Sequence, residues 1–217
     1  QRQMCIRDSF RSVDGLYNQK YKYPPETIIS HSFYMRDPEE FYRFYKDKMI
    51  YQDAKPNMAH KKLAELEAQG KLAAIVTQNI DGLHQMAGSK NVIELHGSIH
   101  RNYCTKCHKF YDLDYIIQSD GVPKCSCGGI IKPDVVLYEE GLNNDDIENA
   151  IRYISEADTL IIGGTSLVVY PAAGLIRYFR GKHLVVINMS PTQTDSQADL
   201  LIADKIGNCL LYTSDAA

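Results

Sequence analysis

The chain has 217 residues, of which 44% are hydrophobic, and its formal net charge is −3. This length is enough for one well-packed core with a smaller domain attached, and the charge gives no general attraction to nucleic acid or to an anionic membrane. No apolar run reaches the roughly 18 to 20 residues of a membrane span, and the start does not have the pattern of a secretory signal. We therefore expect a cytoplasmic protein with no membrane partner and no direct nucleic-acid partner.

The two ends of the chain differ in character from the sequence between them. Residues 1–9 and 211–217 resemble translated adapter or vector sequence, so we expect native sequence from about Phe10 to about Leu210. Finding the same codons at the native locus would contradict this expectation.

Short β-branched runs alternate with helical patterns between these ends. The predicted helices are residues 38–50, 56–69, 144–157 and 171–180, and the predicted strands are residues 73–77, 92–95, 135–138, 159–163 and 184–188. The strands are almost continuously apolar, which is typical of a parallel sheet covered on both faces. The alternation predicts an α/β fold with a doubly wound parallel sheet.

A polar segment follows the first predicted strand. Residues 78–84 read Gln-Asn-Ile-Asp-Gly-Leu-His. Because α/β sheets bind ligands at the carboxyl ends of their strands, this segment is a candidate site. A capped turn, in which Asn79 or Asp81 begins a short helix, is an equally open interpretation.

His96 follows the second predicted strand, within Glu-Leu-His-Gly-Ser. An unperturbed imidazole has a pKa near 6.5, which suits a general base. A single histidine is more often a structural group, and composition gives no reason to prefer His96 over His84 or His100.

Four cysteines form two close pairs in a chain without secretory features. They are Cys104, Cys107, Cys125 and Cys127. Two thiolate pairs brought together across a short ribbon make a tetrahedral Zn²⁺ site, and four thiolates leave no open position, so such a zinc is structural. Two disulfides or free core cysteines are the alternative.

A small-residue turn follows the predicted strand 159–163. Gly164, Thr165 and Ser166 could approach a phosphate or ribose closely, and Asn188 ends the neighbouring strand. A bare strand-to-helix turn is the alternative, because the usual G-x-G-x-x-G pattern is absent.

Taken in order, these motifs resemble the sirtuin family, in its bacterial type. The resemblance covers about Phe10 to Leu210, and coincidence would have to reproduce both the identity and the spacing of many segments. The matching segments are Phe10-Arg11-Ser12, Lys55-Pro56-Asn57, residues 77–84, Glu94-Leu95-His96-Gly97, the four cysteines, residues 132–138, Gly164-Thr165-Ser166-Leu167, Tyr170-Pro171-Ala172-Ala173 and Ile187-Asn188.

The resemblance implies three structural parts. A Rossmann-like NAD-binding domain would comprise residues 72–100 and 135–210. A helical insertion with its connecting helices would occupy residues 13–71, and a small inserted zinc-ribbon module residues 101–134. NAD and acyl-lysine would meet in the cleft between these parts.

The activity implied by the resemblance is NAD-dependent protein-lysine deacetylation. The acetyl group of an acetyl-lysine protein or peptide passes to the ADP-ribose of NAD, with release of nicotinamide. His96 would be the general base, and Asn79 and Asp81 would position the nicotinamide end. The implied NAD contacts are Phe10, Arg11, Gln78, Asn79, Ile80, Asp81, Gly164, Thr165, Ser166, Asn188, Met189, Ser190 and Ile206.

Val136 and Tyr138 would flank the acyl-lysine, whose backbone would pair with the strand at residues 135–138. Family members that remove acidic acyl groups share a Tyr-x-x-Arg pair, which the helical region of this chain does not present at that spacing. We therefore expect a neutral acyl group such as acetyl, and a monomeric enzyme.

The chain departs from the family at its start, where sirtuins have a strand and a Gly-Ala-Gly loop that holds the pyrophosphate of NAD. Only Phe10-Arg11 of that region matches. Loss of a central strand would expose backbone groups of its neighbours, so we expect weak NAD binding and reduced stability or activity.

Two other functions compete with deacetylation. Mono-ADP-ribosyl transfer to protein would use the same NAD and cleft, and would yield modified protein instead of free lysine. A non-catalytic zinc-ribbon binding module would explain the cysteines but would leave the matches at residues 78–84, His96 and residues 164–166 without a purpose.

Overall fold

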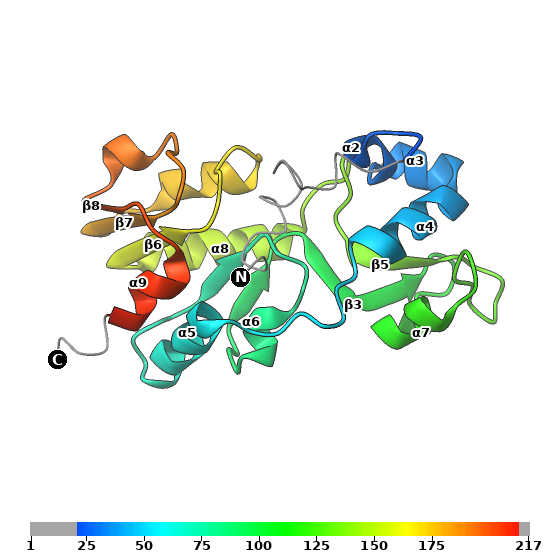
Figure 1. Cartoon of the computed structure of the whole chain (residues 1–217), viewed down its shortest axis with the longest axis horizontal. Helices are drawn as coiled ribbons and strands as arrows, with labels where there is room; N and C mark the ends of the chain where they lie inside the picture. The colour runs from blue at the N-terminus through cyan, green and yellow to red at the C-terminus, as the bar shows by residue number, and fades with distance from the viewer. Residues whose placement is uncertain (1–20, 213–217) are drawn as a thin grey trace.

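The structure is a computed structural model, and it describes residues 21–212. Figure 1 shows two lobes side by side along the long axis of the molecule. The first lobe is built on parallel strands, and the second on short helices and an antiparallel sheet. No helix within residues 21–212 combines the length and the apolar character that crossing a bilayer requires.

The first lobe contains two parallel sheets among the described residues. β1 (Ile75–Thr77) pairs with β2 (Val92–Glu94), and β6 (Thr159–Gly163) pairs with β7 (His183–Ile187), which in turn pairs with β8 (Leu200–Ile202). Together with the surrounding helices, these parallel pairings confirm the predicted α/β class.

Helices pack around these strands. They are α5 (Met58–Ala68), α6 (Leu83–Met86), α8 (Asn144–Glu156), η2 (Ala172–Tyr178), η3 (Asp195–Gln197) and α9 (Ile206–Tyr212). Ala150 and Ile154 of α8 share one apolar cluster with Ile93 and Leu95, so α8 is fixed against the end of β2. The Asn57 side chain accepts a hydrogen bond from the N–H of His60 and so caps α5.

The second lobe joins the helical segment to the cysteine region. Its helices are α2 (Pro25–Ile28), α3 (His31–Arg36), α4 (Pro38–Lys48) and α7 (Leu113–Gln118), and its sheet has the order β4 (Phe110–Tyr111), β3 (Gly97–Cys104), β5 (Ile131–Val135). Phe41 and Phe44 of α4 are fully buried in a cluster that also contains Ile116 and Ile131. Each buried aromatic ring contributes roughly 1.5–3 kcal/mol of transfer free energy, so this shared core holds the two segments together as one unit.

Two of the predicted elements are wrong. The strand predicted at residues 135–138 lies at Ile131–Val135, and the helix predicted at residues 171–180 is a 3-10 helix at Ala172–Tyr178. Pro133 has no N–H to donate to a neighbouring strand, so its presence disfavours a strand at this position. The structure accommodates it in β5 because the register with β3 shifts between Ser98 and Asn102. β3, β4 and β8 were not predicted as strands.

Candidate active site and zinc site

A cleft of about 290 Å³ lies where the ends of β1 and β2 meet the segment after β5 and the loop after β6. It brings together seven of the candidate residues from distant parts of the sequence. These are Gln78, Asn79, Ile80, His96, Val136, Tyr138 and Ser166. The remaining candidates lie outside this lining, and Phe10 and Arg11 lie outside the described residues.

His96 is the histidine that faces this cleft. Its Nδ1 lies 3.0 Å from the carbonyl oxygen of Gln78, and a carbonyl can only accept a hydrogen bond. The contact therefore places the proton of the neutral ring on Nδ1 and makes Nε2 the basic nitrogen. This tautomer is the one that a general base acting through Nε2 requires.

The backbone around His96 is fixed on both sides. Gly97 has φ 71°, and a Cβ at this position would lie 1.9 Å from the carbonyl oxygen of Asp134, so only glycine fits. Arg101 donates to the buried Glu94 and to Asp134, each at 2.7 Å. These contacts tie the end of β2 to β3 and β5, and so fix the direction in which His96 leaves the strand.

The other two candidate histidines have different surroundings. Burial, followed by the neighbouring His60, lowers the pKa of His84 to about 4, and neither His84 nor His100 lines the cleft. Nε2 of His100 lies 3.1 Å from the carbonyl oxygen of Asp81. Of the three histidines, only His96 lines the cleft.

The turn after β1 leads into the short helix α6, but neither Asn79 nor Asp81 is the N-cap residue of that helix. The N–H of Asn79 donates to Oγ1 of Thr77 at 3.0 Å, and the carboxylate of Asp81 accepts from the N–H of Leu83 at 3.0 Å. Asp81 therefore supports the start of α6, whose N-cap residue is Gly82. Gln78 and Asn79 line the cleft, so the capped turn also presents polar side chains to a ligand.

A second group of candidates meets at the carboxyl ends of β6 and β7. Nδ2 of Asn188 donates to the carbonyl oxygens of Thr165 and Ser190, at 3.0 and 2.7 Å. The N–H of Gly164 donates to the carbonyl of Ile187 at 3.1 Å. A Cβ on Gly163 would lie 2.1 Å from Cδ1 of Ile206, so α9 approaches this turn as well.

These residues fit a dinucleotide. Glycines at the turn allow close approach, and hydroxyl and amide groups lie at the carboxyl ends of parallel strands, where open α/β sheets bind nucleotides. Ser166 connects this end of the sheet to the cleft that contains His96. Met189 lies on the same edge with a largely exposed side chain.

The segment after β5 connects the two lobes. The N–H of Val136 donates to the carbonyl of His96 at 3.0 Å. The N–H of Tyr138 donates to the carbonyl of Ile29 at 3.0 Å, and its carbonyl accepts from the N–H of His31 at 2.9 Å. Both backbone groups of Tyr138 are therefore paired with the second lobe, while its side chain remains substantially exposed.

Sequence reasoning missed much of the apolar wall of the cleft. Ile29 and Met49 reach it from the helical segment, and Val168, Val169 and Tyr170 reach it from the loop after β6. Tyr170 belonged to a matched motif, so its neighbourhood could have been found. No local pattern marks Ile29 or Met49, because only the packing of the second lobe brings them to the cleft.

The four cysteines form one compact cluster. Their sulfur atoms lie within 4.8 Å of one another, with separations of 3.4 Å for Cys104–Cys127, 3.6 Å for Cys107–Cys125 and 3.5 Å for Cys107–Cys127. Zn–S bonds of about 2.3 Å in a tetrahedron place sulfurs about 3.8 Å apart, whereas a disulfide has them about 2.05 Å apart. The donor set and spacing fit a structural zinc ion.

Two further observations support this fit. A Cβ on Gly129 would lie 2.5 Å from the sulfur of Cys104, so glycine leaves room for the thiolates. Hydrogen bonds from the N–H of Cys127 and the Tyr111 hydroxyl lower the pKa of Cys125 to about 5. The N–H of Gly129 lowers the pKa of Cys127, but hydrogen bonds to the other three sulfurs outweigh it and raise that pKa to about 12.

Comparison with known proteins decides the family. The sequence model described as the Sir2 family matches residues 3–171. An NAD-dependent protein deacetylase of Clostridium acetobutylicum is 64% identical over 205 residues, covering 93% of this chain and 84% of the relative. The chain belongs to the Sir2 family. A second NAD-dependent protein deacetylase, from Clostridium perfringens, is 67% identical over 205 residues, which cover 93% of this chain and 84% of that relative.

Solved Sir2 structures have the same fold. One, described as Sir2 bound to acetylated peptide, aligns with a TM-score of 0.81 and 40% identity over 90% of this chain and 84% of its own. Another holds an inhibitor, 2′-O-acetyl-ADP-ribose and a deacetylated p53 peptide, and aligns with a TM-score of 0.80 and 41% identity over 86% of this chain and 83% of its own. Membership of the Sir2 family confirms the resemblance that the ordered motifs indicated.

Proposed function

We propose that this Sir2-family chain is an NAD-dependent protein-lysine deacetylase. Its substrates are acetyl-lysine proteins or peptides, NAD and one molecule of water, and its products are free lysine, nicotinamide and O-acetyl-ADP-ribose. One observation carries the proposal: His96, with Nδ1 bonded to the Gln78 carbonyl, lines the same cleft as Ser166 from the nucleotide end and Val136 and Tyr138 from the substrate segment.

The chain's own residues divide the work between them. When bound, NAD supplies the ribose that accepts the acetyl group and the nicotinamide that leaves. Nε2 of His96 accepts a proton from a ribose hydroxyl, while the Gln78 carbonyl keeps the ring in the required tautomer. Asn79 and Asp81 position the nicotinamide end.

Two sets of residues hold the ligands on either side of His96. The adenosine half of NAD is held by Gly164, Thr165, Ser166, Asn188, Met189, Ser190 and Ile206, with Phe10, Arg11, Gln78 and Ile80 as further contacts. Val136 and Tyr138 flank the acyl-lysine. The hydrogen bonds from Asn188 to the Thr165 and Ser190 carbonyls support this assignment, because they order both loops around one site.

The zinc ion has a structural role in this account. Cys104, Cys107, Cys125 and Cys127 would hold it at the end of β3, where the ion would cross-link the two cysteine pairs of the second lobe. We also propose three functional modules. They are a helical insertion at residues 13–71, a zinc-binding module at residues 101–134, and an NAD-binding domain made of residues 72–100 and 135–210. A cytoplasmic location, a monomeric state and the absence of a nucleic-acid partner are also proposed, and the net charge of −3 supports the last of these.

A matched pair of histidine variants tests the proposed general base. His96→Ala removes the base and should lower the deacetylation rate on an acetyl-lysine peptide by about 100-fold or more. His183→Ala removes an exposed histidine at the start of β7 and should leave the rate unchanged. The rates are followed by nicotinamide release at saturating NAD. Equal activity of the His96 variant and the parent chain would contradict the assignment.

A further inference from the structure

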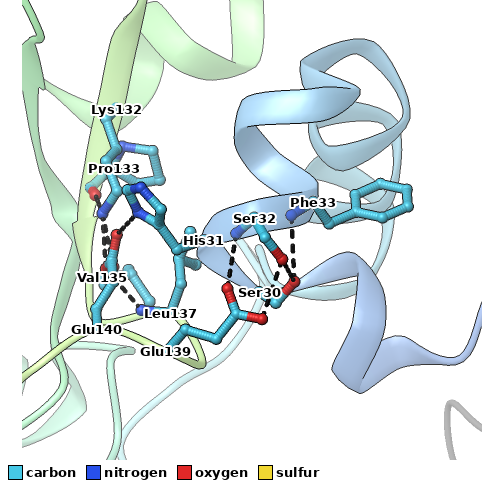
Figure 2. A network of polar contacts seen from close by, with 10 residues as sticks. All are labelled: Ser30, His31, Ser32, Phe33, Lys132, Pro133, Val135, Leu137, Glu139 and Glu140. Atoms are coloured by element: carbon cyan, nitrogen blue, oxygen red, sulfur yellow. Dashed lines mark hydrogen bonds and ion pairs between the residues drawn. The ribbon is translucent and has the colours of Figure 1, made fainter.

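The segment that follows β5 is attached to α3 by two consecutive carboxylates, Glu139 and Glu140 (Figure 2). We infer that these two glutamates are positioning residues that set the affinity for the acetyl-lysine peptide. They hold residues 136–140 against the second lobe in the shape that receives the substrate. This inference rests on the proposed function and adds residues that lie beside the substrate segment.

Glu139 binds the first turn of α3 with both carboxylate oxygens. Oε2 accepts from the N–H of Ser32 at 2.9 Å, and Oε1 accepts from the Ser32 hydroxyl at 3.0 Å. The Ser30 side chain, which caps the same helix, accepts from the N–H of Phe33 at 3.2 Å. Negative charge is favourable at the start of a helix, and charge-assisted hydrogen bonds are stronger than neutral ones.

The backbone at Glu139 indicates that its side chain matters. The N–H of Glu140 donates to the carbonyl of Leu137 at 3.1 Å and closes a four-residue turn whose third residue, Glu139, has φ 77°. This turn position favours glycine, because the left-handed region is unfavourable for residues with a Cβ. A strained non-glycine residue here is consistent with a carboxylate that compensates by holding α3.

Glu140 fixes the other side of the segment. Its Oε2 accepts from the N–H of Leu137 at 2.9 Å and from Nζ of Lys132 at 3.0 Å, and its Oε1 lies 2.8 Å from Nδ1 of His31. Burial acts to raise the pKa of this carboxyl, but the three partners outweigh burial and lower it. The group is therefore a carboxylate at neutral pH and acts as a fixed anchor.

These contacts explain how the peptide site spans both lobes. The segment begins at Val136, whose N–H donates to the carbonyl of His96 in the first lobe. Two residues later, the backbone of Tyr138 is hydrogen-bonded to Ile29 and His31 in the second lobe. Glu139 and Glu140 hold the segment at its far end, and both also line the cleft. Their carboxylates already have partners on the protein, so they act through the segment they hold, not as acids or bases toward the substrate.

The variant Glu139→Gly tests this inference, because glycine removes the carboxylate and relieves the positive φ. We expect a rise of about tenfold in KM for the acetyl-lysine peptide and in the Kd of the peptide alone, measured by calorimetry. kcat and the KM for NAD should change less than about twofold, and Tm should not fall, because glycine suits this turn.

Ser32→Ala should raise the peptide KM and Kd by a smaller factor, and should cause no further rise when it is combined with Glu139→Gly. Ser155→Ala, on the exposed face of α8, is the matched serine control and should change nothing.

Amide hydrogen exchange provides a readout that does not depend on activity. Glu139→Gly should speed exchange at Ser32 and Tyr138. Faster exchange with unchanged peptide Kd would overturn the positioning role, and unchanged exchange would overturn the attachment itself.

If the parent chain binds the peptide but shows no NAD-dependent turnover, the proposed function fails while the peptide Kd values still decide this inference. If the parent chain binds no acetyl-lysine peptide, both fall.

Discussion

The half-buried His84 and the buried His60 form a pair beside the turn that carries Asp81. Their ring centroids are 4.6 Å apart, and the Nδ1 atom of His84 has no hydrogen-bond partner among the described residues. Burial and then the neighbouring His60 lower the pKa of His84 to about 4, and burial is also the main cause that lowers the pKa of His60. Both rings are therefore neutral in the folded protein at neutral pH.

This pair predicts a loss of stability in mild acid. The unfolded chain has an ordinary His84 pKa of 6.5 and binds more protons than the folded chain between pH 6.5 and about pH 4. The free energy of unfolding should therefore fall as the pH drops through this window, by about 2 kcal/mol at pH 5 from His84 alone, and the loss should stop growing below the folded pKa.

The variant His84→Phe keeps an aromatic ring but cannot take up a proton. Urea unfolding at pH 7.5 and pH 5 should show a smaller difference between the two pH values for this variant than for the parent chain. The subtraction removes the acid sensitivity of the other groups, because both proteins share them. An identical pH dependence in the two proteins would show that His84 is not a buried neutral histidine.

Composition could name the candidate histidines, and only the family resemblance favoured His96 among them. The structural support for His96 is its contact with the Gln78 carbonyl and its place in the cleft lining, and both arise from the packing of β1 against β2. Asp81 shows the same limit, because it accepts from the N–H of Leu83 beside the start of α6, but the N-cap residue is Gly82 and not Asn79 or Asp81 as the capping interpretation had it.

Among the elements, α4 is the one that joins the helical segment to the cysteine region. Tyr42 and Tyr45 both lie on its buried face. The Tyr42 hydroxyl donates to the carbonyl of Ile131 in β5, whereas the Tyr45 hydroxyl is buried with no hydrogen-bond partner among the described residues. Burial raises the pKa of both phenols, so both stay neutral.

This difference predicts opposite effects of one chemical change. Tyr42→Phe should lower the free energy of unfolding by about 1–2 kcal/mol, because a buried hydrogen bond is lost. Tyr45→Phe should be neutral or stabilising by up to about 1 kcal/mol, because it removes a buried hydroxyl without a partner. Chemical denaturation at pH 7.5 measures both, and a larger loss for Tyr45→Phe than for Tyr42→Phe would contradict the packing described for α4.

Elements with a strong periodic pattern were predicted well. The strand at Thr159–Gly163 has the predicted bounds, and α8 at Asn144–Glu156 differs from its prediction by one residue. β3 was missed because its residues 98–102 read Ser-Ile-His-Arg-Asn, without the apolar run of a buried strand. Its longer pairing is with β5, which lies far along the chain, and the register shift that admits Pro133 has no local signal.

At the scale of the whole molecule, the cleft proposed as the active site is lined from both lobes. Motifs in the first lobe supply His96 and Ser166, which the order of the sequence matches could locate. The second lobe supplies Ile29 and Met49, and its attachment through Glu139 to Ser32 gives the substrate segment its shape. These contacts join residues more than 100 positions apart in sequence, so a single sequence could not predict them.

In the proposed reaction, removal of the acetyl group from lysine is coupled to release of nicotinamide from NAD, so neither occurs alone. We would incubate an acetyl-lysine peptide with this chain at millimolar NAD, and separately without NAD, and identify every product by mass spectrometry. We expect free lysine, nicotinamide and O-acetyl-ADP-ribose in equal amounts, and none of them without NAD. Release of acetate without NAD, or attachment of ADP-ribose to the peptide with the acetyl group still in place, would contradict it.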